Sequence, residues 1–529
     1  MKRLIHIGIA ATARDGQVLA LRGPHIQPRL PFCMFYIRFV CTYPIGYPVT
    51  MENANMFLRQ YYLQCLSHAS YLVGDRSTGK AIVVDPQRDV DQYINDATAE
   101  GLTITSVFET HFHADFLSGH LELASKVGAE VVYGKSAEGH VDFPIRTMQH
   151  GEHFSLGEVD LEVLETPGHT PESVCIVVRP NGPTSTPHAV FTGDTLFIGD
   201  VGRPDLAQKA ADMTQEQLAG ILFDSLRSKV MTLADDVIVY PAHGAGSACG
   251  KNLSKETVGS IGDQKATNYA LRADMTREEF IKEVTDGLLP PPAYFPMNVK
   301  LNKEGYENID NVIKNSAKPL SAEEFELLAN ETDAVILDVR HQSEFSKGFI
   351  PQSIFIGLGG TFAPWVGALI KDIKQEILLV TPIGEEESTI TRLSRVGFDN
   401  VIGYLDGSFE TWKKSGKEID VLNAISVAAL EEKIAENPLI FDVRKPGEYL
   451  SEHALIAENT PLDYLNDHIS QFPDKKPFYV HCAGGYRSVI AASILKARGF
   501  HNVIDILGGF DAIKNSSIEK TAFVCPSTL

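Results

Sequence analysis

Short apolar runs alternate with longer helical stretches from about residue 56 onward, which is the pattern of layered α/β domains. Five runs have the composition of buried strands, and each leads into a loop that contains Asp, His or Gly: 81–85, 104–108, 161–164, 189–192 and 237–240. Residues 254–300 are polar and helical in pattern, with a proline-rich segment at 289–292. Because proline interrupts regular structure, we expect a domain to end in this region and a linker to follow.

The C-terminal part of the chain contains an internal repeat. The segment 336–340 (ILDVR) recurs at 440–444 (IFDVR), and the segment 397–402 (GFDNVI) is echoed at 499–504 (GFHNVI). Two motifs that recur at nearly the same spacing indicate two copies of one domain. We place the copies at residues 305–420 and 421–529.

The first fifty residues differ from the rest. They are apolar in part, but Arg38 and several prolines interrupt them, and they lack an amphipathic period. A signal peptide would need a cleaner apolar core and a small-residue cleavage site. We interpret residues 1–50 as an N-terminal extension, either disordered or an over-extended translation start, with a targeting segment as the alternative. The first folded domain is then expected at residues 51–300.

Composition and charge narrow the function classes. The 529 residues are 44% hydrophobic and 22% charged, as in a globular protein of several domains. The formal net charge of -21 would repel phosphates, so we expect no nucleic-acid partner. No apolar run has the length of a membrane span, and the seven cysteines contain no CxxC pair, so we expect no membrane partner and a reducing cytoplasm. We also expect a homo-oligomer.

Four motifs that contain histidine or aspartate follow predicted strands, each on a turn rich in glycine or proline. Their candidate ligands are His111, His113, Asp115, His169, Asp194 and His243. A single residue of this kind is usually a cap or a surface group, but loops at strand ends can aim several side chains at one point. Two histidines and one carboxylate form the open triad of non-haem iron oxygenases, so the motifs predict a metal site.

The motifs read THFHAD at 110–115, TPGHT at 166–170, GDTLF at 193–197 and YPAHG at 240–244. With them, residues 56–298 resemble the metallo-β-lactamase superfamily, and most closely its persulfide dioxygenase branch. The resemblance implies an αββα sandwich and one Fe(II) held by His111, His169 and Asp194. It also implies that the site is lined by orienting or acid–base groups, namely His113, Asp115 and His243.

One position departs from the superfamily's pattern. The dinuclear members have a histidine directly after the aspartate of the first motif, and this chain has Phe116. A second metal would therefore lose an imidazole ligand, which favours one redox metal over two zinc ions, with zinc as the alternative. Arg203 is a candidate to orient an anionic substrate, and a surface salt bridge is its alternative role. Cys249 could receive sulfur near the metal, but a passive small residue is the stronger interpretation.

Residues 479–488 (YVHCAGGYRS) have the pattern of a strand, a tight loop and the start of a helix. Cys482 would then face backbone N–H groups and the positive end of the helix, which stabilise a thiolate or persulfide anion. Gly484 and Gly485 let the loop curl around the sulfur, and the guanidinium of Arg487 offers a fork of donors for sulfite or thiosulfate. A buried structural cysteine is the alternative.

This second repeat resembles the rhodanese family, whose fold is an α/β domain with a parallel sheet. Cys482 matches the family's nucleophile, and the resemblance makes Gly484, Gly485 and Ser488 candidates for substrate binding beside Arg487. The first repeat has no cysteine at the corresponding position, where residues 380–384 read VTPIG and are followed by three glutamates. We expect this first copy to be catalytically inactive and to act as a spacer or docking element.

These observations lead to the hypothesis of an enzyme with two linked activities. The first domain would use O2 to oxidise a low-molecular-weight persulfide, such as glutathione persulfide, to sulfite. The second repeat would transfer sulfane sulfur and so form or consume thiosulfate. One alternative is a glyoxalase II-like thioester hydrolase with two zinc ions and an accessory rhodanese. The other is a non-enzymatic sulfur carrier or sensor with a degenerate metal site.

Overall fold

The computed structural model describes residues 55–525. The interpretation of residues 1–50 as an extension therefore lies outside the described residues. Regular structure begins at Met56, where the hydrophobic pattern predicts it. Within the described part, no helix combines the length and the apolar character needed to cross a membrane.

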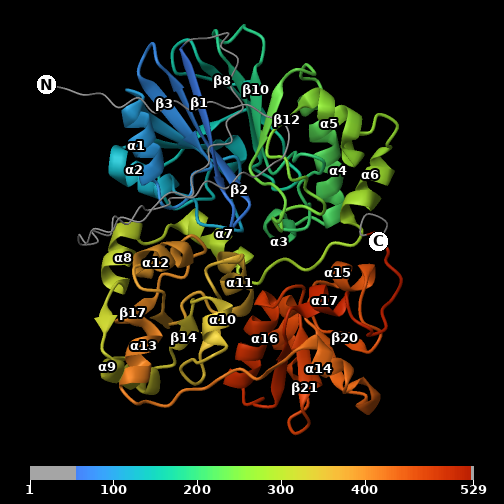
Figure 1. The fold of residues 1–529 in the computed structure, drawn as a ribbon. Coiled ribbons are helices and arrows are strands. Elements are labelled where there is room, and N and C mark those ends of the chain that lie inside the picture. Colours follow the sequence, from blue (N-terminus) through green and yellow to red (C-terminus); the bar gives the residue numbers. More distant parts are fainter. Residues whose placement is uncertain (1–54, 526–529) are drawn as a thin grey trace, which may run out of the picture. The chain divides into compact units, whose positions relative to one another are not determined.

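Two six-stranded sheets form the first part of the chain (Figure 1). The first has the order β1-β2-β3-β4-β5-β6, with bounds Met56–Leu63, His68–Asp75, Lys80–Val84, Thr103–Phe108, Glu130–Gly134 and Arg146–Met148. The second has the order β12-β11-β10-β9-β8-β7, and from β7 to β12 the bounds are His153–Ser155, Asp160–Glu165, Val174–Arg179, Ala189–Gly193, Ile238–Pro241 and Gly259–Ser260. The five strands predicted from sequence are β3, β4, β8, β10 and β11, so that prediction is confirmed.

Apolar side chains hold these two sheets together and attach helices to their outer faces. One buried cluster joins Val84 and Phe108 of the first sheet to Leu161 and Phe191 of the second, so it lies between the sheets. Two further clusters pack the opposite faces of the sheets against helices. Because successive residues of a strand point to opposite faces, strands buried on both sides are almost entirely apolar.

The helices complete a layered αββα sandwich, which confirms the expected fold of this part (Figure 1). The first sheet is covered by α1 (Asp91–Ala99) and α2 (His120–Val127). The second sheet is covered by α4 (Gln215–Ser225), α5 (Ile261–Thr267) and α6 (Arg277–Thr285). A single turn, α3 (Gln208–Ala211), precedes α4.

Two helices connect the sandwich to the repeats, α7 (Phe295–Glu304) and α8 (Ile309–Ser316). Residue 300, the predicted end of the first domain, lies inside α7. The side chain of Asn302 in this helix donates to the backbone oxygens of His113 and Phe116, both at 2.9 Å, and accepts from the backbone of Ser118 at 3.0 Å. By these contacts α7 supports the loop that carries the first histidine motif.

The C-terminal part contains two five-stranded sheets with the same strand order, β13-β17-β16-β14-β15 and β18-β22-β21-β19-β20. All of their strand pairs are parallel, as expected for rhodanese-like domains. From β13 to β22 the bounds are Pro319–Leu320, Val335–Asp338, Ile354–Phe355, Ile377–Val380, Val401–Leu405, Ala424–Ile425, Leu439–Asp442, Ala457–Asn459, Phe478–His481 and Val503–Ile506. We call the two sheets with their helices repeat 1 and repeat 2.

The helices of the repeats also correspond. Repeat 1 contains α9 (Ala322–Glu331), α10 (Gln342–Phe345), α11 (Phe362–Leu369), α12 (Glu386–Ser394) and α13 (Ser408–Lys414). Repeat 2 contains α14 (Val427–Glu431), α15 (Pro446–Ser451), α16 (Tyr486–Ala497) and α17 (Gly509–Ile513). The helix α12 follows β16 as α16 follows β21, so α12 occupies in repeat 1 the place of the helix after the Cys482 loop.

Repeat 1 is attached to the sandwich by buried charge pairs. The guanidinium of Arg88, with a fully buried side chain, donates to both carboxylate oxygens of Asp399 at 2.7 and 2.8 Å and to the backbone oxygen of Ser394. The guanidinium of Arg395 forms a second two-pronged pair with Asp89, at 2.7 and 2.6 Å. Each bidentate pair fixes the orientation of one domain on the other as well as the distance.

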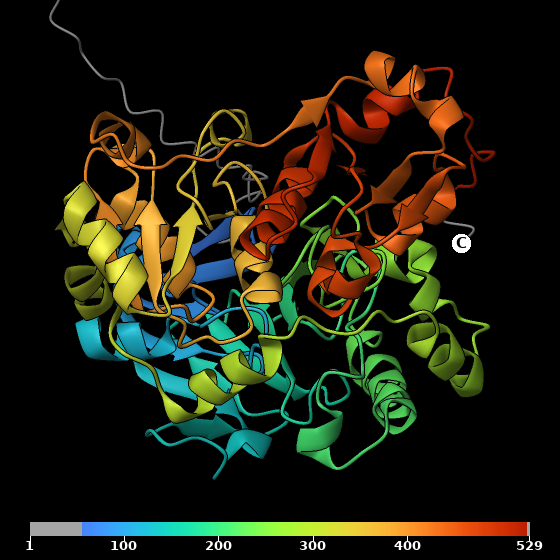
Figure 2. The ribbon, with the colours of Figure 1, turned by 90° about the horizontal axis from the view of Figure 1, so that it is seen from below.

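Repeat 2 contacts repeat 1 through the helix that follows the Cys482 loop (Figure 2). The backbone of Phe355 in β15 donates to the hydroxyl of Ser493 in α16 at 2.9 Å, and the hydroxyl of Tyr486 donates to the backbone oxygen of Gly357 at 2.7 Å. One buried cluster includes Phe116 of the sandwich, Phe362 of repeat 1 and Cys482 of repeat 2. All three domains therefore meet in a shared apolar core.

We expect Arg88→Met to lower the free energy of unfolding by about 3 kcal/mol, because it leaves a carboxylate and two backbone oxygens without their charged donor. Arg59→Met is the matched control, since the Arg59 side chain is 40% exposed in its pair with Asp96, and it should cost less than about 1 kcal/mol. Urea unfolding of both variants measures the difference. Equal shifts would contradict a role for Arg88 in holding repeat 1 on the sandwich.

Candidate functional site

The candidate metal ligands lie at the ends of strands in both sheets of the sandwich. His111 follows β4 of the first sheet, while His169, Asp194 and His243 follow β8, β10 and β11 of the second. Gly202 allows the loops to approach each other, because a Cβ there would lie 1.9 Å from the backbone oxygen of Asp194. The loops thus meet at one edge of the sandwich.

The structure brings His111, His169 and Asp194 together with all three side chains buried. Their ligand atoms lie within 4.8 Å of one another, and the Oδ2 atom of Asp194 lies 3.7 Å from Nε2 of His111 and 3.4 Å from Nε2 of His169. This Oδ2 atom is buried and has no hydrogen-bond partner in the described part of the chain. A buried carboxylate oxygen without a donor is costly unless a cation binds it, so this donor set fits a divalent metal.

The other ring nitrogens and the other carboxylate oxygen are held by protein groups. Nδ1 of His169 lies 2.8 Å from the backbone oxygen of Arg203, and Nδ1 of His111 lies 3.0 Å from the hydroxyl of Thr110. Nδ1 of His243 donates to Oδ1 of Asp194 at 2.7 Å. Such outer contacts fix ring orientation and leave Nε2 of His111 and of His169 free for ligation.

The electrostatics favour the protonation states that ligation needs. Burial lowers the pKa of His111 well below its ordinary value, so its imidazole is neutral. Burial alone would raise the pKa of Asp194, but His243, His111 and His169 hold it well below the usual range. Burial likewise opposes the charge on His243, yet Asp115 and Asp194 raise its pKa to about 10. The cluster therefore presents a neutral imidazole at His111 beside the carboxylate of Asp194, with a protonated His243 behind that carboxylate.

His113, the second histidine of the first motif, faces a different set of partners. Its Nε2 atom lies 3.1 Å from Oδ1 of Asp85 and 3.3 Å from Oε2 of Glu109, and all three side chains are buried. Burial opposes a charge on His113, but the two carboxylates raise its pKa well above the ordinary value. Between two acids His113 is a charge partner, and it lies outside the group formed by His111, His169 and Asp194.

Asp115 and His243 form a second group of candidate ligands together with Cys249. Nε2 of His243 lies 2.8 Å from Oδ2 of Asp115, and the ligand atoms of the three lie within 4.8 Å of one another. Burial, followed by the field of Asp115, raises the pKa of Cys249 well above its ordinary value, so without a cation this thiol is neutral. Phe116 packs against the ring of His68 with centroids 4.0 Å apart.

The two other candidates near this site are occupied or lie outside the ligand groups. The guanidinium of Arg203 donates to both oxygens of Asp205, at 2.6 and 2.7 Å, so its own donors are used within the protein. His120 is buried near Tyr133, Phe143 and Tyr306, and burial lowers its pKa to about 3.

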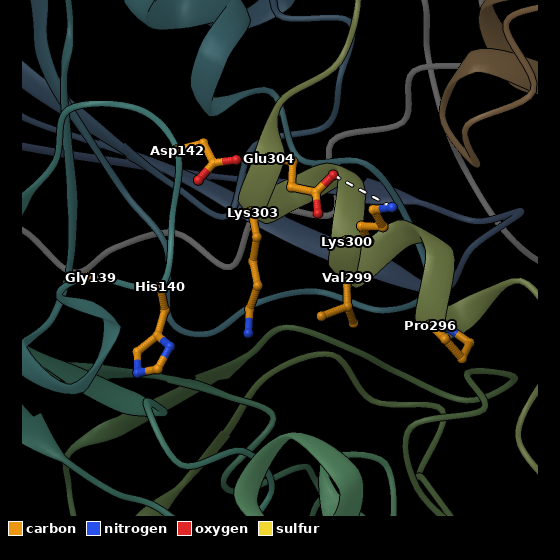
Figure 3. A pocket seen from close by; sticks show the side chains of 8 residues that line it. All are labelled: Gly139, His140, Asp142, Pro296, Val299, Lys300, Lys303 and Glu304. Atoms are coloured by element: carbon orange, nitrogen blue, oxygen red, sulfur yellow. Dashed lines mark ion pairs between the residues drawn. The ribbon is translucent and has the colours of Figure 1, made fainter.

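A hollow of about 480 Å³ lies beside α7, and its lining includes His140, Lys300 and Lys303 (Figure 3). In this view Lys300 faces Glu304, with which it pairs at 3.7 Å. None of the metal-site candidates lines it, so the hollow is separate from the ligand groups.

The Cys482 loop brings a backbone N–H against the sulfur of Cys482, whose side chain is buried. The backbone N–H of Gly485, whose φ is +110°, donates to the sulfur at 3.1 Å. A residue with a side chain rarely adopts this φ, so glycine at 485 allows the amide to turn toward the sulfur. A Cβ at Gly484 would lie 3.6 Å from Asp511, an ordinary contact, so close packing does not require glycine there.

Arg487 and Ser488 lie at the first turn of α16, just after the loop. The guanidinium of Arg487 donates to both oxygens of Glu448 in α15, at 2.5 and 2.8 Å, which anchors it beside the loop. Ser488 is fully buried and faces Asp505 of β22. In repeat 1 the segment after β16 contains no thiol, as the sequence predicts.

Several residues that shape the site were missed in the sequence. Asp85 is the last residue of the predicted strand at 81–85, and Glu109 directly precedes the first motif. Their positions at strand ends could therefore have marked them as candidates in the sequence. His68 is fully buried with both ring nitrogens unpaired in the described part, but its segment carries no motif. Asn302 and Tyr294, whose hydroxyl donates to the backbone of Asp115 at 3.2 Å, lie too far along the chain for any local pattern to reveal them.

Comparison with known proteins identifies both parts of the chain. A model of the metallo-beta-lactamase superfamily matches residues 63–243, and a model of the rhodanese-like domain matches residues 321–415 and 426–516. A metallo-beta-lactamase crystal structure from Staphylococcus aureus subsp. aureus COL shares 32% identity with a TM-score of 0.59, covering 67% of this chain and 99% of the other. The chain belongs to the metallo-β-lactamase superfamily and carries two rhodanese-like domains after that domain.

Two curated relatives point to different activities. The mitochondrial persulfide dioxygenase ETHE1 of Bos taurus is 29% identical over 255 residues, which are 48% of this chain and 90% of the relative. A hydroxyacylglutathione hydrolase of Polaromonas sp. is 30% identical over 175 residues, 33% of this chain and 61% of that relative. The resemblance stated from the motifs is therefore confirmed at the level of the family and of the fused architecture.

We expect Asp194→Asn to weaken divalent-metal binding by more than about a hundredfold, because the variant loses the only negative ligand of the group His111, His169 and Asp194. Asp160→Asn is the control, since Asp160 is buried in β8 but pairs with His153 away from the cluster. Elemental analysis after dialysis measures the metal retained by each variant. Full retention by Asp194→Asn would contradict the assignment.

The pH dependence of stability should report Asp505. Burial raises its pKa to about 6, against the opposing effect of the Ser488 hydroxyl. The folded chain then binds this proton more tightly than the unfolded chain, so stability falls as pH rises from about 4 to about 6, by roughly 3 kcal/mol in all. Asp505→Asn removes this loss. Urea unfolding across this range should show the variant gaining on the unmodified chain as pH rises, and a constant difference would contradict the assignment.

Proposed function

We propose that the first domain oxidises a low-molecular-weight thiol persulfide with O2 and one molecule of water, releasing sulfite, the free thiol and two protons, and that repeat 2 transfers sulfane sulfur to form or consume thiosulfate. The observation that carries the first half is the convergence of His111, His169 and Asp194 on one point, with Oδ2 of Asp194 left without a donor in the part of the chain that the structure describes. The similarity to a persulfide dioxygenase over 90% of that relative supports the same conclusion.

In this proposal His111, His169 and Asp194 hold one Fe(II), which when bound supplies the redox chemistry that lets O2 react with a closed-shell sulfur compound. His243 keeps Asp194 ionised and fixes its rotation through the 2.7 Å hydrogen bond to Oδ1. Phe116, Phe197 and Tyr294 are buried in the apolar cluster beside the site and limit the access of bulk solvent to it.

In repeat 2 the reaction is a displacement at sulfur. The thiolate of Cys482 attacks the outer sulfur of a donor, a new S–S bond forms, and the donor leaves as a thiolate or as sulfite. In the opposite direction sulfite attacks the outer sulfur of the Cys482 persulfide, and thiosulfate leaves while the thiolate returns. The amide of Gly485 donates to the sulfur of Cys482, and the positive charge of Arg487 acts on the same sulfur. Both therefore stabilise the thiolate that attacks in the first reaction and returns in the second.

The fusion supports the coupling of the two halves. In this proposal sulfite is released by the same molecule that carries repeat 2, so the product of the first site forms near the second. In this proposal repeat 1 is catalytically inactive, because it lacks a cysteine at the position of Cys482. It contacts both the sandwich and repeat 2, so it acts as the docking element between them.

A dinuclear thioester hydrolase is the second candidate. It is favoured by the group formed by Asp115, His243 and Cys249, which could hold a second ion, and by the similarity to a hydroxyacylglutathione hydrolase. Phe116 disfavours it, because an imidazole ligand is absent at that position. About one iron per chain supports the dioxygenase, and about two zinc ions per chain support the hydrolase.

We expect the iron-loaded chain to consume O2 when it receives glutathione persulfide, with sulfite and thiosulfate as sulfur products. In Cys482→Ser the O2 uptake should persist, thiosulfate should fall at least about a hundredfold, and sulfite should accumulate, since this variant lacks only the nucleophile of repeat 2. Cys525→Ser, which changes an exposed cysteine, is the control and should behave as the unmodified chain. An oxygen electrode with product analysis measures all three. The proposal fails if no O2 is consumed.

A further inference from the structure

One cationic side chain between the two proposed active sites has no carboxylate partner among residues 55–525. Every other arginine in residues 55–525 forms an ion pair or donates a hydrogen bond to an oxygen atom of the protein, whereas the side-chain hydrogen bond of Arg392 is with the sulfur of Cys65. Arg392 of α12 has neither a carboxylate nor a backbone oxygen among the contacts of the described residues, and its Nε atom is buried without a hydrogen-bond partner. In a chain with a net charge of -21, a guanidinium left without an acid requires an explanation.

The surroundings of Arg392 come from all three domains. Its guanidinium lies 5.2 Å from the centre of the Phe362 ring in repeat 1. Cys65 of the sandwich and Tyr486 of repeat 2 lie close enough to act on its pKa, although burial, which lowers that pKa, is the larger effect. Arg392 is partly exposed, so an ion from solution can reach it.

The position is held rigidly by its neighbours. Tyr486 directly follows the loop of Cys482, its hydroxyl is fixed by the backbone of Gly357, and a Cβ at Gly360 would lie 2.4 Å from its ring. On the other side, Arg395 of the same segment is locked to Asp89, and its backbone oxygen accepts from Leu117, close to the first histidine motif. These contacts fix the residues on both sides of Arg392, with Tyr486 next to the Cys482 loop and Arg395 next to the metal-site loop.

We propose that Arg392, with the thiol of Cys65 beside it, forms a binding site for a small sulfur oxyanion, sulfite or thiosulfate, at the junction of the three domains. A guanidinium over an apolar ring suits such an ion, because its planar fork of donors pairs with two oxygens while the ring excludes water on one face. The inference rests on the proposed function, in which sulfite passes from the first domain to repeat 2. It gives repeat 1, which lacks a nucleophile, a role in holding that ion.

A footprinting experiment tests the site without relying on enzyme activity. The full chain carrying Cys482→Ser is treated with iodoacetamide, and peptide mass spectrometry gives the rate of Cys65 alkylation relative to the exposed Cys525 in the same sample. The internal ratio cancels any reagent that the oxyanion consumes. Sulfite and thiosulfate should each lower this ratio at least about threefold, and sodium chloride at the same ionic strength should not.

Variants assign the protection to the guanidinium. In Arg392→Gln the ratio should no longer respond to sulfite, while Arg392→Lys, which keeps the charge, should respond in part. Arg498→Gln is the matched control, because Arg498 lies directly after a helix of repeat 2 and bonds to Asn466 at the surface, and it should respond fully. Circular dichroism melting confirms that the variants fold.

The outcomes separate this site from the proposed function. Absence of protection in the unmodified background, or equal protection in Arg392→Gln, overturns the oxyanion site even if the enzyme consumes O2 with a persulfide. Protection that depends on Arg392 supports the site even if O2 uptake fails. In the active chain, Arg392→Gln should also raise the KM for sulfite in thiosulfate formation about tenfold and leave O2 uptake unchanged.

Discussion

The buried carboxylate of Asp194 is the interaction on which the site depends. One of its oxygens accepts a hydrogen bond from His243, and the other faces His111 and His169 without a donor among residues 55–525. A charge taken out of water in this way is stable only if cations or donors surround it. The three histidines meet that need in part, and a divalent ion would meet it in full. The strand-end loops, the close approach at Gly202 and the support from α7 all serve to hold this arrangement.

The two histidines of the first motif contact different acidic residues. His111 faces Asp194, while His113 lies between Asp85 and Glu109, whose carboxylates stabilise its protonated form. The difference arises because two acidic side chains lie behind the loop on the strand side, where His113 points. With His113 engaged and Phe116 in place of an imidazole, the donor set left at the centre is three groups, which is what one open-sided metal requires.

Much of this could be predicted from the sequence. The strands at 81–85 and 189–192 are apolar on both faces, which fixes them as buried, and the two DVR segments reveal the duplicated domain without any structure. The metal motifs identify the three residues that the structure brings together, His111, His169 and Asp194, because the motifs directly follow strands of the two sheets. Arg88, Asn302 and Arg392 could not be predicted, since each acts across more than a hundred residues of chain or between domains, and a local pattern carries no information on such contacts. The ion pair of Arg203 with Asp205 could have been predicted, because the two residues are only two positions apart. This pair occupies the guanidinium that we expected to orient the substrate.

The central claim is that a single metal ion binds between His111, His169 and Asp194. Anomalous diffraction at the iron absorption edge, from crystals of the iron-loaded chain, tests this claim most directly. The account predicts one anomalous peak within bonding distance of those three side chains and none between Asp115, His243 and Cys249. Two peaks, or one peak at the second position alone, would contradict it.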